Sequence, residues 1–343
     1  MRKENAMKAA VYYKALDVRL EDRPIPSLDE GEALIKVAYT GICGSDVSIY
    51  LGKHPRAVPP VIIGHEFSGE VVDIRASNSH LKVGDRVAVE PLFNCGHCYA
   101  CVDGAYNSCI NLKMPGHNTD GSYAEYAKAP VQHIYKIPEG VSMEVAATVE
   151  PTSVSAGAVR RSRLKLGDHA VVLGGGPIGL TVGQIAMLTS NVPVALVEVS
   201  DWRLELGRKL GFDVIDAKKE NVREAIMERT NGRGAGVIFD AAGAAPLTEQ
   251  ISTFVKVRGQ IVMVAMPKEP RPVDLGIFAF KQAEMIGCRA FTYGDCEAAI
   301  AMMAAKKIDI ASLISHVMPL EQYTEGLEMA KKAADSMKIL LRP

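Results

Sequence analysis

The clearest chemical signal is a run of four cysteines within a span of fifteen residues: Cys95, Cys98, Cys101 and Cys109. Four thiolates at this spacing can close a tetrahedral shell around zinc and leave no open position, which is typical of a structural site. An iron–sulfur cluster is the main alternative, but the bacterial ferredoxin run has three residues before its last cysteine and a proline after it. Here seven residues precede Cys109, and Ile110 follows it. The spacing therefore favours a structural zinc.

A second set of metal-type side chains is spread over three motifs: Cys43 in GICGSD, His65 and Glu66 in GHEF, and Glu150 in VEP. A catalytic zinc takes about three protein ligands and keeps one position open for a substrate oxygen. Cysteine, histidine and a carboxylate make a suitable set, and Asp46 is available to hold the second ring nitrogen of His65. The pattern predicts a catalytic zinc, with Glu66 and Glu150 both open as the third ligand.

The segment GGGPIG fits the G-x-G-x-x-G pattern of a dinucleotide-binding turn, because it follows an apolar strand and opens an apolar helix. Its glycines allow a tight turn, close approach of a pyrophosphate to the helix N-terminus, and close packing of helix on strand. The predicted cofactor-binding residues are Gly174, Gly176, Pro177, Ile178, Gly179, Glu198 and Arg203. A carboxylate at Glu198 binds the ribose diol and repels a 2′-phosphate, so NAD is favoured over NADP. Arg203 is predicted either to pack on the adenine or to be a surface charge.

The elements that must position these residues change character near Pro151. Short β-runs broken by glycine and proline turns fill the first 150 residues. Strands then alternate with helices, which predicts a doubly wound parallel sheet; the strands are 170–173, 194–199, 237–240 and 260–264, and the helices 178–188, 202–210 and 246–254. A helix at 296–306 and a strand at 338–341 follow. We therefore predict an α/β protein with a β-rich catalytic zinc domain (1–152 and 288–343) and an NAD-binding domain (153–287).

Length and composition are typical of a globular protein of two domains. The chain has 343 residues, of which 48 % are apolar and 23 % charged, and its net charge of −1 gives no reason to expect nucleic acid or an anionic membrane as a partner. No secretory signal and no membrane span are apparent. Crowded cysteines without such a signal favour metal over disulfides, and we expect a cytoplasmic location.

The motifs GICGSD, GHEFSGEV, the four-cysteine run, VEPTSVS and GGGPIG occur in the order found in the zinc-containing medium-chain dehydrogenases, and the chain resembles that family from about Met7 to Pro343. It is most similar to the polyol branch, which includes sorbitol, butanediol, threonine and sugar-acid dehydrogenases. Glu150 stands where liver-type alcohol dehydrogenases have a second cysteine ligand, and Gly44-Ser45 follows Cys43. The resemblance implies a GroES-like catalytic domain, a Rossmann domain, NAD, and two zinc ions per chain.

The resemblance also implies roles for the residues around the catalytic zinc. Cys43 and His65 would be ligands, and of Glu66 and Glu150 one would bind directly and the other through water or by exchange. Ser45 would accept the proton of the substrate hydroxyl. Many family members pass this proton to a histidine three residues further on, where this chain has Ser48. Either Ser48 acts with a water in its place, or the proton leaves by Glu150 or another route.

The function expected on these grounds is hydride transfer between NAD and a secondary alcohol of a polyol, sugar alcohol or sugar acid. L-Threonine and 2,3-butanediol are alternative substrates. A catalytically silent scaffold that binds NAD and zinc, or a lyase that uses NAD structurally, are alternatives of a different class. The resemblance further implies a homodimer or homotetramer, with an edge strand near Phe278–Ile286 pairing across subunits.

Overall fold

The computed structural model describes residues 5–267 and 269–343, and these divide into two compact units. Unit 1 comprises Met1–Pro151, Ala299–Lys306 and Ile310–Pro343, and unit 2 comprises Thr152–Ala298 and Lys307–Asp309. Two helices run across the division along the chain, α4 (Val149–Arg161) and α11 (Tyr293–Ala304). The mixed α/β architecture of the two units confirms the predicted fold class.

Unit 1 is built on two sheets, one of three strands in the order β2-β1-β4 and one of seven strands in the order β15-β16-β3-β5-β6-β8, with β7 paired to β3. The strands are β1 (Ala6–Lys14), β2 (Asp17–Pro24), β3 (Glu32–Gly41), β4 (Val61–Ile62), β5 (Glu66–Arg75), β6 (Arg86–Val89), β7 (Tyr126–Pro130), β8 (Ile134–Lys136), β15 (Ile314–Pro319) and β16 (Lys338–Arg342). Alternate residues of β3 are buried, among them Ala33, Ile35 and Val37, as period-2 patterning requires. The C-terminal strand β16 pairs with β3, so the end of the chain completes the sheet that carries the metal-type residues.

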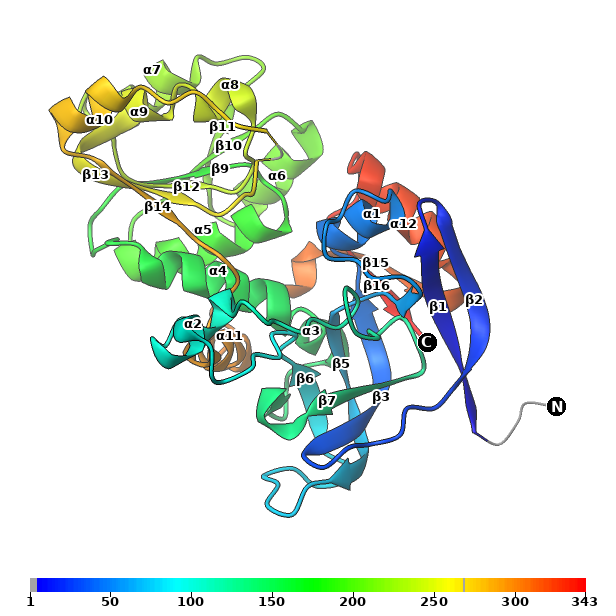
Figure 1. Ribbon diagram of the computed structural model, residues 1–343. Coiled ribbons are helices and arrows are strands. Elements are labelled where there is room, and N and C mark those ends of the chain that lie inside the picture. The colour runs from blue at the N-terminus through cyan, green and yellow to red at the C-terminus, as the bar shows by residue number, and fades with distance from the viewer. Residues whose placement is uncertain (1–4, 268) are drawn as a thin grey trace. The chain divides into compact units, whose positions relative to one another are not determined.

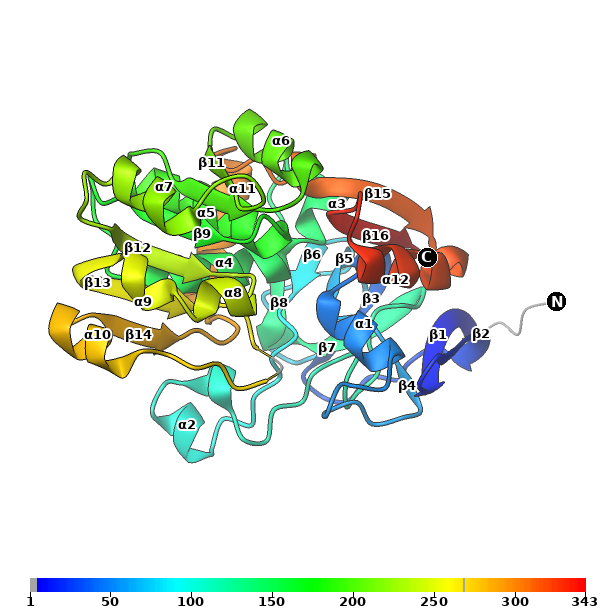
Figure 2. The ribbon, with the colours of Figure 1, turned by 90° about the horizontal axis from the view of Figure 1, so that it is seen from above.

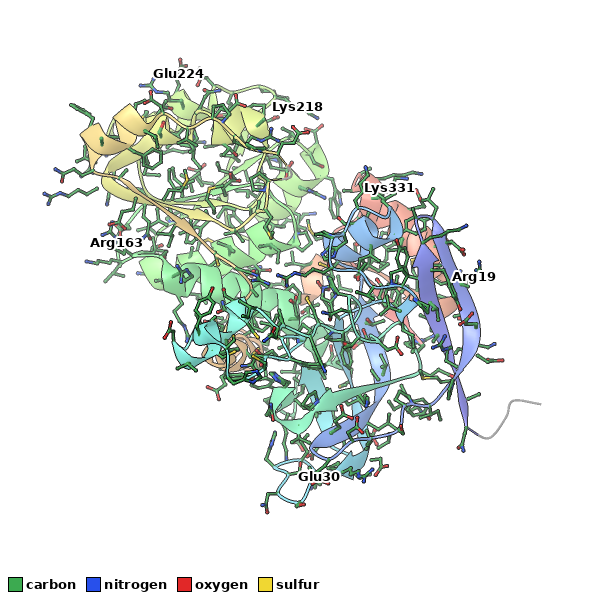
Figure 3. All side chains as sticks on the ribbon, viewed as in Figure 1. Arg19, Glu30, Arg163, Lys218, Glu224 and Lys331 are labelled. Atoms are coloured by element: carbon green, nitrogen blue, oxygen red, sulfur yellow. The ribbon has the colours of Figure 1, made fainter. Side chains whose placement is uncertain are left out.

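Short helices connect the strands of unit 1: α1 (Gly44–Tyr50), α2 (Tyr99–Val102), α3 (Met143–Ala146), α12 (Tyr323–Lys332) and the 3₁₀ turns η1 (Tyr106–Ser108), η2 (Val131–His133), η3 (Ala311–Leu313) and η4 (Leu320–Gln322). The amphipathic helix α12 buries Tyr323 and Leu327 in the core that also contains Ile49 of α1. Charged side chains such as Arg19 on β2 and Lys331 on α12 project outward (Figure 3).

Unit 2 is a six-stranded parallel sheet in the order β11-β10-β9-β12-β13-β14, with helices on both faces (Figures 1 and 2). The strands are β9 (Ala170–Leu173), β10 (Ala195–Glu198), β11 (Asp213–Asp216), β12 (Ala235–Asp240), β13 (Val255–Met263) and β14 (Glu284–Gly287), and the helices are α5 (Pro177–Ser190), α6 (Asp201–Lys209), α7 (Val222–Arg229), α8 (Ala245–Thr248), α9 (Ile251–Phe254) and α10 (Leu275–Lys281). All four residues of β9 are buried, because the central strand of a parallel sheet is covered on both faces.

Three local expectations differ from the structure. The helix expected at 246–254 is two short helices, α8 and α9, and the edge strand expected near 278–286 begins as helix α10 and becomes strand only in β14. Residues 288–298 were assigned to the zinc domain but cluster with unit 2. The reason is their anchoring to α4: Arg160 Nε lies 3.0 Å from Asp295 Oδ1, and Arg160 Nη2 donates to the Gly294 carbonyl at 2.8 Å.

Candidate active site

The structure brings together three of the metal-type residues from the GICGSD and GHEF motifs. Ligand atoms of Cys43, His65 and Glu66 lie within 4.8 Å of one another. Cys43 is the N-cap residue of α1, and Glu66 begins β5 directly after His65. His65 and Glu66 are buried, which favours a bound cation over solvation of the carboxylate. The three side chains offer the soft, borderline and hard donors that suit zinc.

Asp46 fixes the orientation of this group. Its Oδ2 accepts a hydrogen bond from the Cys43 backbone N–H at 2.8 Å, which caps α1, and its Oδ1 lies 3.4 Å from Nδ1 of His65. Tyr123 donates to the same carboxylate at 3.3 Å. Burial alone would raise the pKa of Asp46, but the adjacent His65 and the hydrogen bond from the Cys43 N–H bring that pKa below its usual value. With Nδ1 directed at Asp46, His65 keeps Nε2 for a metal.

The two serines of α1 differ in their surroundings. Ser45 Oγ lies 3.4 Å from Nε2 of His65, so its hydroxyl borders the three metal-type side chains. Ser48 is half-buried, and its hydroxyl donates to the Gly44 carbonyl one turn earlier at 3.1 Å. Its proton is therefore engaged by the helix backbone, whereas its oxygen lone pairs can still accept.

Lys338 is a residue of this site that the sequence analysis missed. Its Nζ lies 2.6 Å from Glu66 Oε2 and 3.3 Å from the Ile42 carbonyl, and both charged side chains are buried. Burial alone would lower the pKa of Lys338, but Glu66 raises it above the usual value. Gly41 leaves the space for this pair, because a Cβ there would collide with Glu66 Oε2. The available signal was a lysine at the head of KILL, an apolar strand at the end of the chain.

Glu150 lies in the first turn of α4 and is also buried, but outside the group formed by Cys43, His65 and Glu66. Burial, together with the negative charge of Glu66, raises the pKa of Glu150 to about 7. The two glutamates therefore influence each other electrostatically, although only Glu66 reaches the other two ligand atoms.

The four-cysteine run forms a second cluster in unit 1, with its ligand atoms again within 4.8 Å of one another. Sulfur atoms of Cys98 and Cys101 are 3.5 Å apart, as are those of Cys95 and Cys109. All seven cysteines lie in the described part of the chain and are free thiols. A hydrogen bond from the His97 backbone N–H, with others from neighbouring groups, lowers the pKa of Cys95 to about 5, which favours the thiolate that metals bind.

In unit 2 the glycine turn after β9 has the shape expected of a phosphate-binding loop. Gly174 has φ of +98°, a Cβ at Gly179 would collide with the Gly174 carbonyl, and Gly176 is the N-cap residue of α5 with Pro177 at its first turn. Glu198 at the end of β10 is buried and accepts a hydrogen bond from the Gly175 N–H at 2.7 Å. Arg203, predicted either to pack on the adenine or to be a surface charge, lies on α6 with a guanidinium nitrogen 3.8 Å from that carboxylate.

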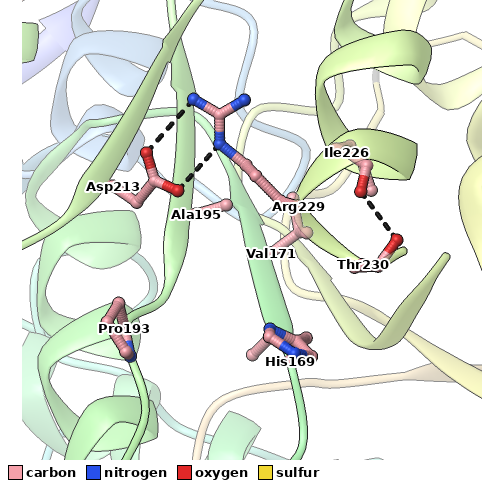
Figure 4. A pocket seen from close by; sticks show the side chains of 9 residues that line it. His169, Val171, Pro193, Ala195, Asp213, Ile226, Arg229 and Thr230 are labelled. Atoms are coloured by element: carbon pink, nitrogen blue, oxygen red, sulfur yellow. Dashed lines mark hydrogen bonds and ion pairs between the residues drawn. The ribbon is translucent and has the colours of Figure 1, made fainter. Parts of the chain in front are cut away.

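A cavity of about 170 Å³ lies at the amino-terminal ends of three strands of this sheet, at the end opposite to the glycine turn (Figure 4). It is lined at the first residues of β9, β10 and β11 by Ala170, Ala195 and Asp213, and Arg229 there is paired with Asp213 at 2.8 Å. Nucleotides bind at the carboxyl ends of parallel strands, so this cavity is separate from the glycine turn. In the described residues, no helix is long and apolar enough to cross a membrane.

Comparisons with known proteins identify the family of the chain. Residues 29–139 match the alcohol dehydrogenase GroES-like domain, and residues 177–305 match the zinc-binding dehydrogenase domain. The chain is 38 % identical to 2-dehydro-3-deoxy-L-galactonate 5-dehydrogenase of Pseudoalteromonas atlantica over 91 % of each chain, and 32 % identical to sorbitol dehydrogenase of Halalkalibacterium halodurans over 94 % of this chain and 95 % of that one. A solved structure assigned as a zinc-binding dehydrogenase of Sinorhizobium meliloti, bound to NADP, superposes with a TM-score of 0.94 at 28 % identity, covering 99 % of this chain and all of that one. The chain therefore belongs to the zinc-dependent medium-chain dehydrogenase family, in the branch of the polyol dehydrogenases.

Proposed function

We propose that this alcohol dehydrogenase oxidises a secondary alcohol of a polyol, sugar alcohol or sugar acid with NAD, at a zinc ion held by Cys43, His65 and Glu66. The observation that carries the proposal is the convergence of these three ligand atoms within 4.8 Å, beside the hydroxyl of Ser45. Three protein ligands leave one coordination position for a substrate oxygen, which distinguishes this cluster from the closed four-cysteine cluster.

The residues around that zinc have different roles. A zinc ion bound there would act as a Lewis acid and lower the pKa of the substrate hydroxyl. Ser45 would accept the hydroxyl proton while passing its own proton on, through Ser48 and a water, Glu150 or another route. Asp46 holds the His65 ring so that Nε2 keeps its position. Glu66 is the third ligand because it lies in the ligand group, and Glu150 contributes a nearby negative charge from outside it.

A second zinc in the four-cysteine cluster is structural. The cluster supplies four sulfur donors and no open position, so the metal ties the loop around α2 and η1 together instead of binding substrate. A chain with both clusters filled contains about two zinc ions.

The cofactor choice rests on Glu198. Its buried carboxylate beside the Gly175 N–H is placed to accept hydrogen bonds from the adenosine ribose, and it would repel a 2′-phosphate. The Sinorhizobium meliloti structure was bound to NADP. The preference for NAD is therefore proposed for this chain from its own residue Glu198. Arg203, on the first turns of α6, is proposed to pack near the adenine.

The test is NADH formation by metal-replete protein with NAD and each member of a panel: D-sorbitol, 2,3-butanediol, L-threonine and a sugar acid. We expect NADH with at least one polyol, and preference for L-threonine or 2,3-butanediol would redirect the substrate assignment. A catalytically silent scaffold or a lyase gives no NADH with any of them, and that outcome contradicts the proposal.

We further propose a homodimer or homotetramer in the cytoplasm. Strand β14 is an edge of the six-stranded sheet, and the preceding helix α10 leaves Phe280 86 % and Leu275 76 % exposed, which supports burial against a second copy. A reducing compartment suits seven free thiols. Light scattering should show an oligomer that Phe280→Glu dissociates and that Leu16→Glu, at an exposed site in unit 1, does not.

A further inference from the structure

The imidazole rings of His65, His117 and His54 form a row of consecutive ring contacts, called the histidine row below. The ring centroids of His65 and His117 are 5.1 Å apart at 66°, and those of His117 and His54 are 4.5 Å apart at 73°. His117 is 2 % exposed, whereas His54 is half-buried. The three rings therefore lead from the candidate zinc ligand towards the surface of unit 1, and the mechanism above uses only the first.

The chain holds this row rigidly. A Cβ at Gly116 would lie 2.6 Å from the Gly64 carbonyl oxygen, so the backbone beside His117 packs directly on the backbone beside His65. Gly64 and Gly116 both have positive φ, of +94° and +80°, which only glycine adopts easily. The His117 carbonyl accepts a hydrogen bond from the Val58 N–H at 2.8 Å, and this contact brings the segment that carries His54 alongside.

Local hydrogen bonds give the two rings opposite tautomers. Nδ1 of His54 accepts from the Arg56 backbone N–H at 3.3 Å, so the ring proton of neutral His54 is on Nε2. Nδ1 of His117 lies 3.3 Å from the Pro115 carbonyl, which can only accept, so Nδ1 carries the proton and Nε2 keeps its lone pair. Among the described residues neither Nε2 atom has a hydrogen-bond partner.

We propose that His117 Nε2 and His54 Nε2–H bind a second hydroxyl of the substrate, next to the one that is oxidised. A hydroxyl group both donates and accepts, so it satisfies one bare nitrogen and one N–H together. A carboxylate or phosphate needs donors only and would face the lone pair of His117, so the pair selects a neutral diol or polyol at this position. The proposal rests on the proposed function, because it places the second hydroxyl relative to the zinc-bound one.

The kinetic test compares two alcohols that differ by one neighbouring hydroxyl, 2,3-butanediol and 2-butanol. For His117→Leu we expect kcat/KM for the diol to fall by about 10- to 100-fold, mainly through KM, with little change for the monohydric alcohol. His117→Gln, which returns an acceptor, should recover much of the loss. The control His316→Leu removes an imidazole whose one hydrogen-bond partner among the described residues is its neighbour Ser315, and it should change neither value. An equal loss for both alcohols would show a packing role and overturn the proposal, as would no loss for the diol.

A spectroscopic test does not depend on turnover. Long-range ¹H–¹⁵N spectra of the zinc-loaded protein should show the Nδ1–H tautomer for His117 and the Nε2–H tautomer for His54. Added 2,3-butanediol or D-sorbitol should shift both Nε2 signals and leave His316 unchanged. The opposite tautomers, or Nε2 signals that no diol moves, would overturn the inference even if the enzyme oxidises alcohols. Absence of NADH with every alcohol, with these signals still responding, would instead overturn the proposed function.

Discussion

Lys338 Nζ lies 2.6 Å from Glu66 Oε2, and with side chains 7 % and 1 % exposed the two form a buried ion pair. The residues are 272 positions apart, so the last strand of the chain returns to hold a carboxylate of the candidate zinc site. The pair neutralises one charge of a site that also contains Glu150, Asp46 and the Cys43 thiol. Assembly of the metal site therefore depends on β16 being in place beside β3.

In zinc-free protein, replacing Lys338 by Met should reduce the free energy of unfolding by about 3–5 kcal/mol, because it leaves the Glu66 carboxylate buried without a cationic partner. Chemical denaturation followed by circular dichroism measures the change. Lys331→Met is the matched control, since Lys331 pairs with Glu328 on the surface of α12 and should cost less than about 1 kcal/mol. A loss at Lys338 no larger than that at Lys331 would show that the buried pair contributes little.

The third zinc ligand can be identified by comparing two isosteric changes. Glu66→Gln should weaken zinc binding at the Cys43 site by at least about 10-fold, whereas Glu150→Gln should have a smaller effect, because only Glu66 lies within 4.8 Å of both other ligand atoms. Competition with a chromophoric chelator gives both affinities. Stronger loss in the Glu150 variant would reverse the assignment.

The four-cysteine cluster should affect stability separately from catalysis. Cys98→Ser should lower the zinc content by about one ion per chain and reduce resistance to unfolding, because the metal ties the loop together. Cys288→Ser, at a thiol outside both clusters, serves as the control and should retain the full zinc content. A Cys98 variant with unchanged zinc content would exclude a structural zinc in this cluster.

The preference for NAD over NADP should depend on Glu198, the acid at the end of β10. Glu198→Ser should raise kcat/KM for NADP relative to NAD by at least about 100-fold, because the carboxylate that repels the 2′-phosphate is gone. Glu205→Ser, at an exposed acid of α6, should leave the ratio unchanged. If wild-type enzyme already prefers NADP, the role assigned to Glu198 is wrong.

Sequence patterns predicted the parts of this molecule that depend on local periodicity. The strand expected at 170–173 is β9, and the helix expected at 178–188 is the core of α5, because apolar runs and a glycine turn specify both. Helix α10 was missed because none of its residues is fully buried, although Phe278 packs against the core of unit 2, so the apolar periodicity of a core-facing helix is weak there. Lys338 was missed because its partner lies on another strand, and such pairing is decided by tertiary structure. The two histidines of the row needed the contact between the Gly64 and Gly116 backbones, which no spacing reveals.

The most direct test is to measure NADH formation, zinc content and NAD affinity together in wild type and Cys43→Ser. Wild type should form NADH with at least one polyol, lose that activity on chelation and regain it with added zinc. The variant should lose turnover and about one zinc per chain, yet bind NAD with nearly unchanged affinity, because the glycine turn belongs to unit 2. Full turnover by Cys43→Ser, or no NADH from zinc-loaded wild type with any alcohol, would contradict a zinc-dependent dehydrogenase centred on Cys43, His65 and Glu66.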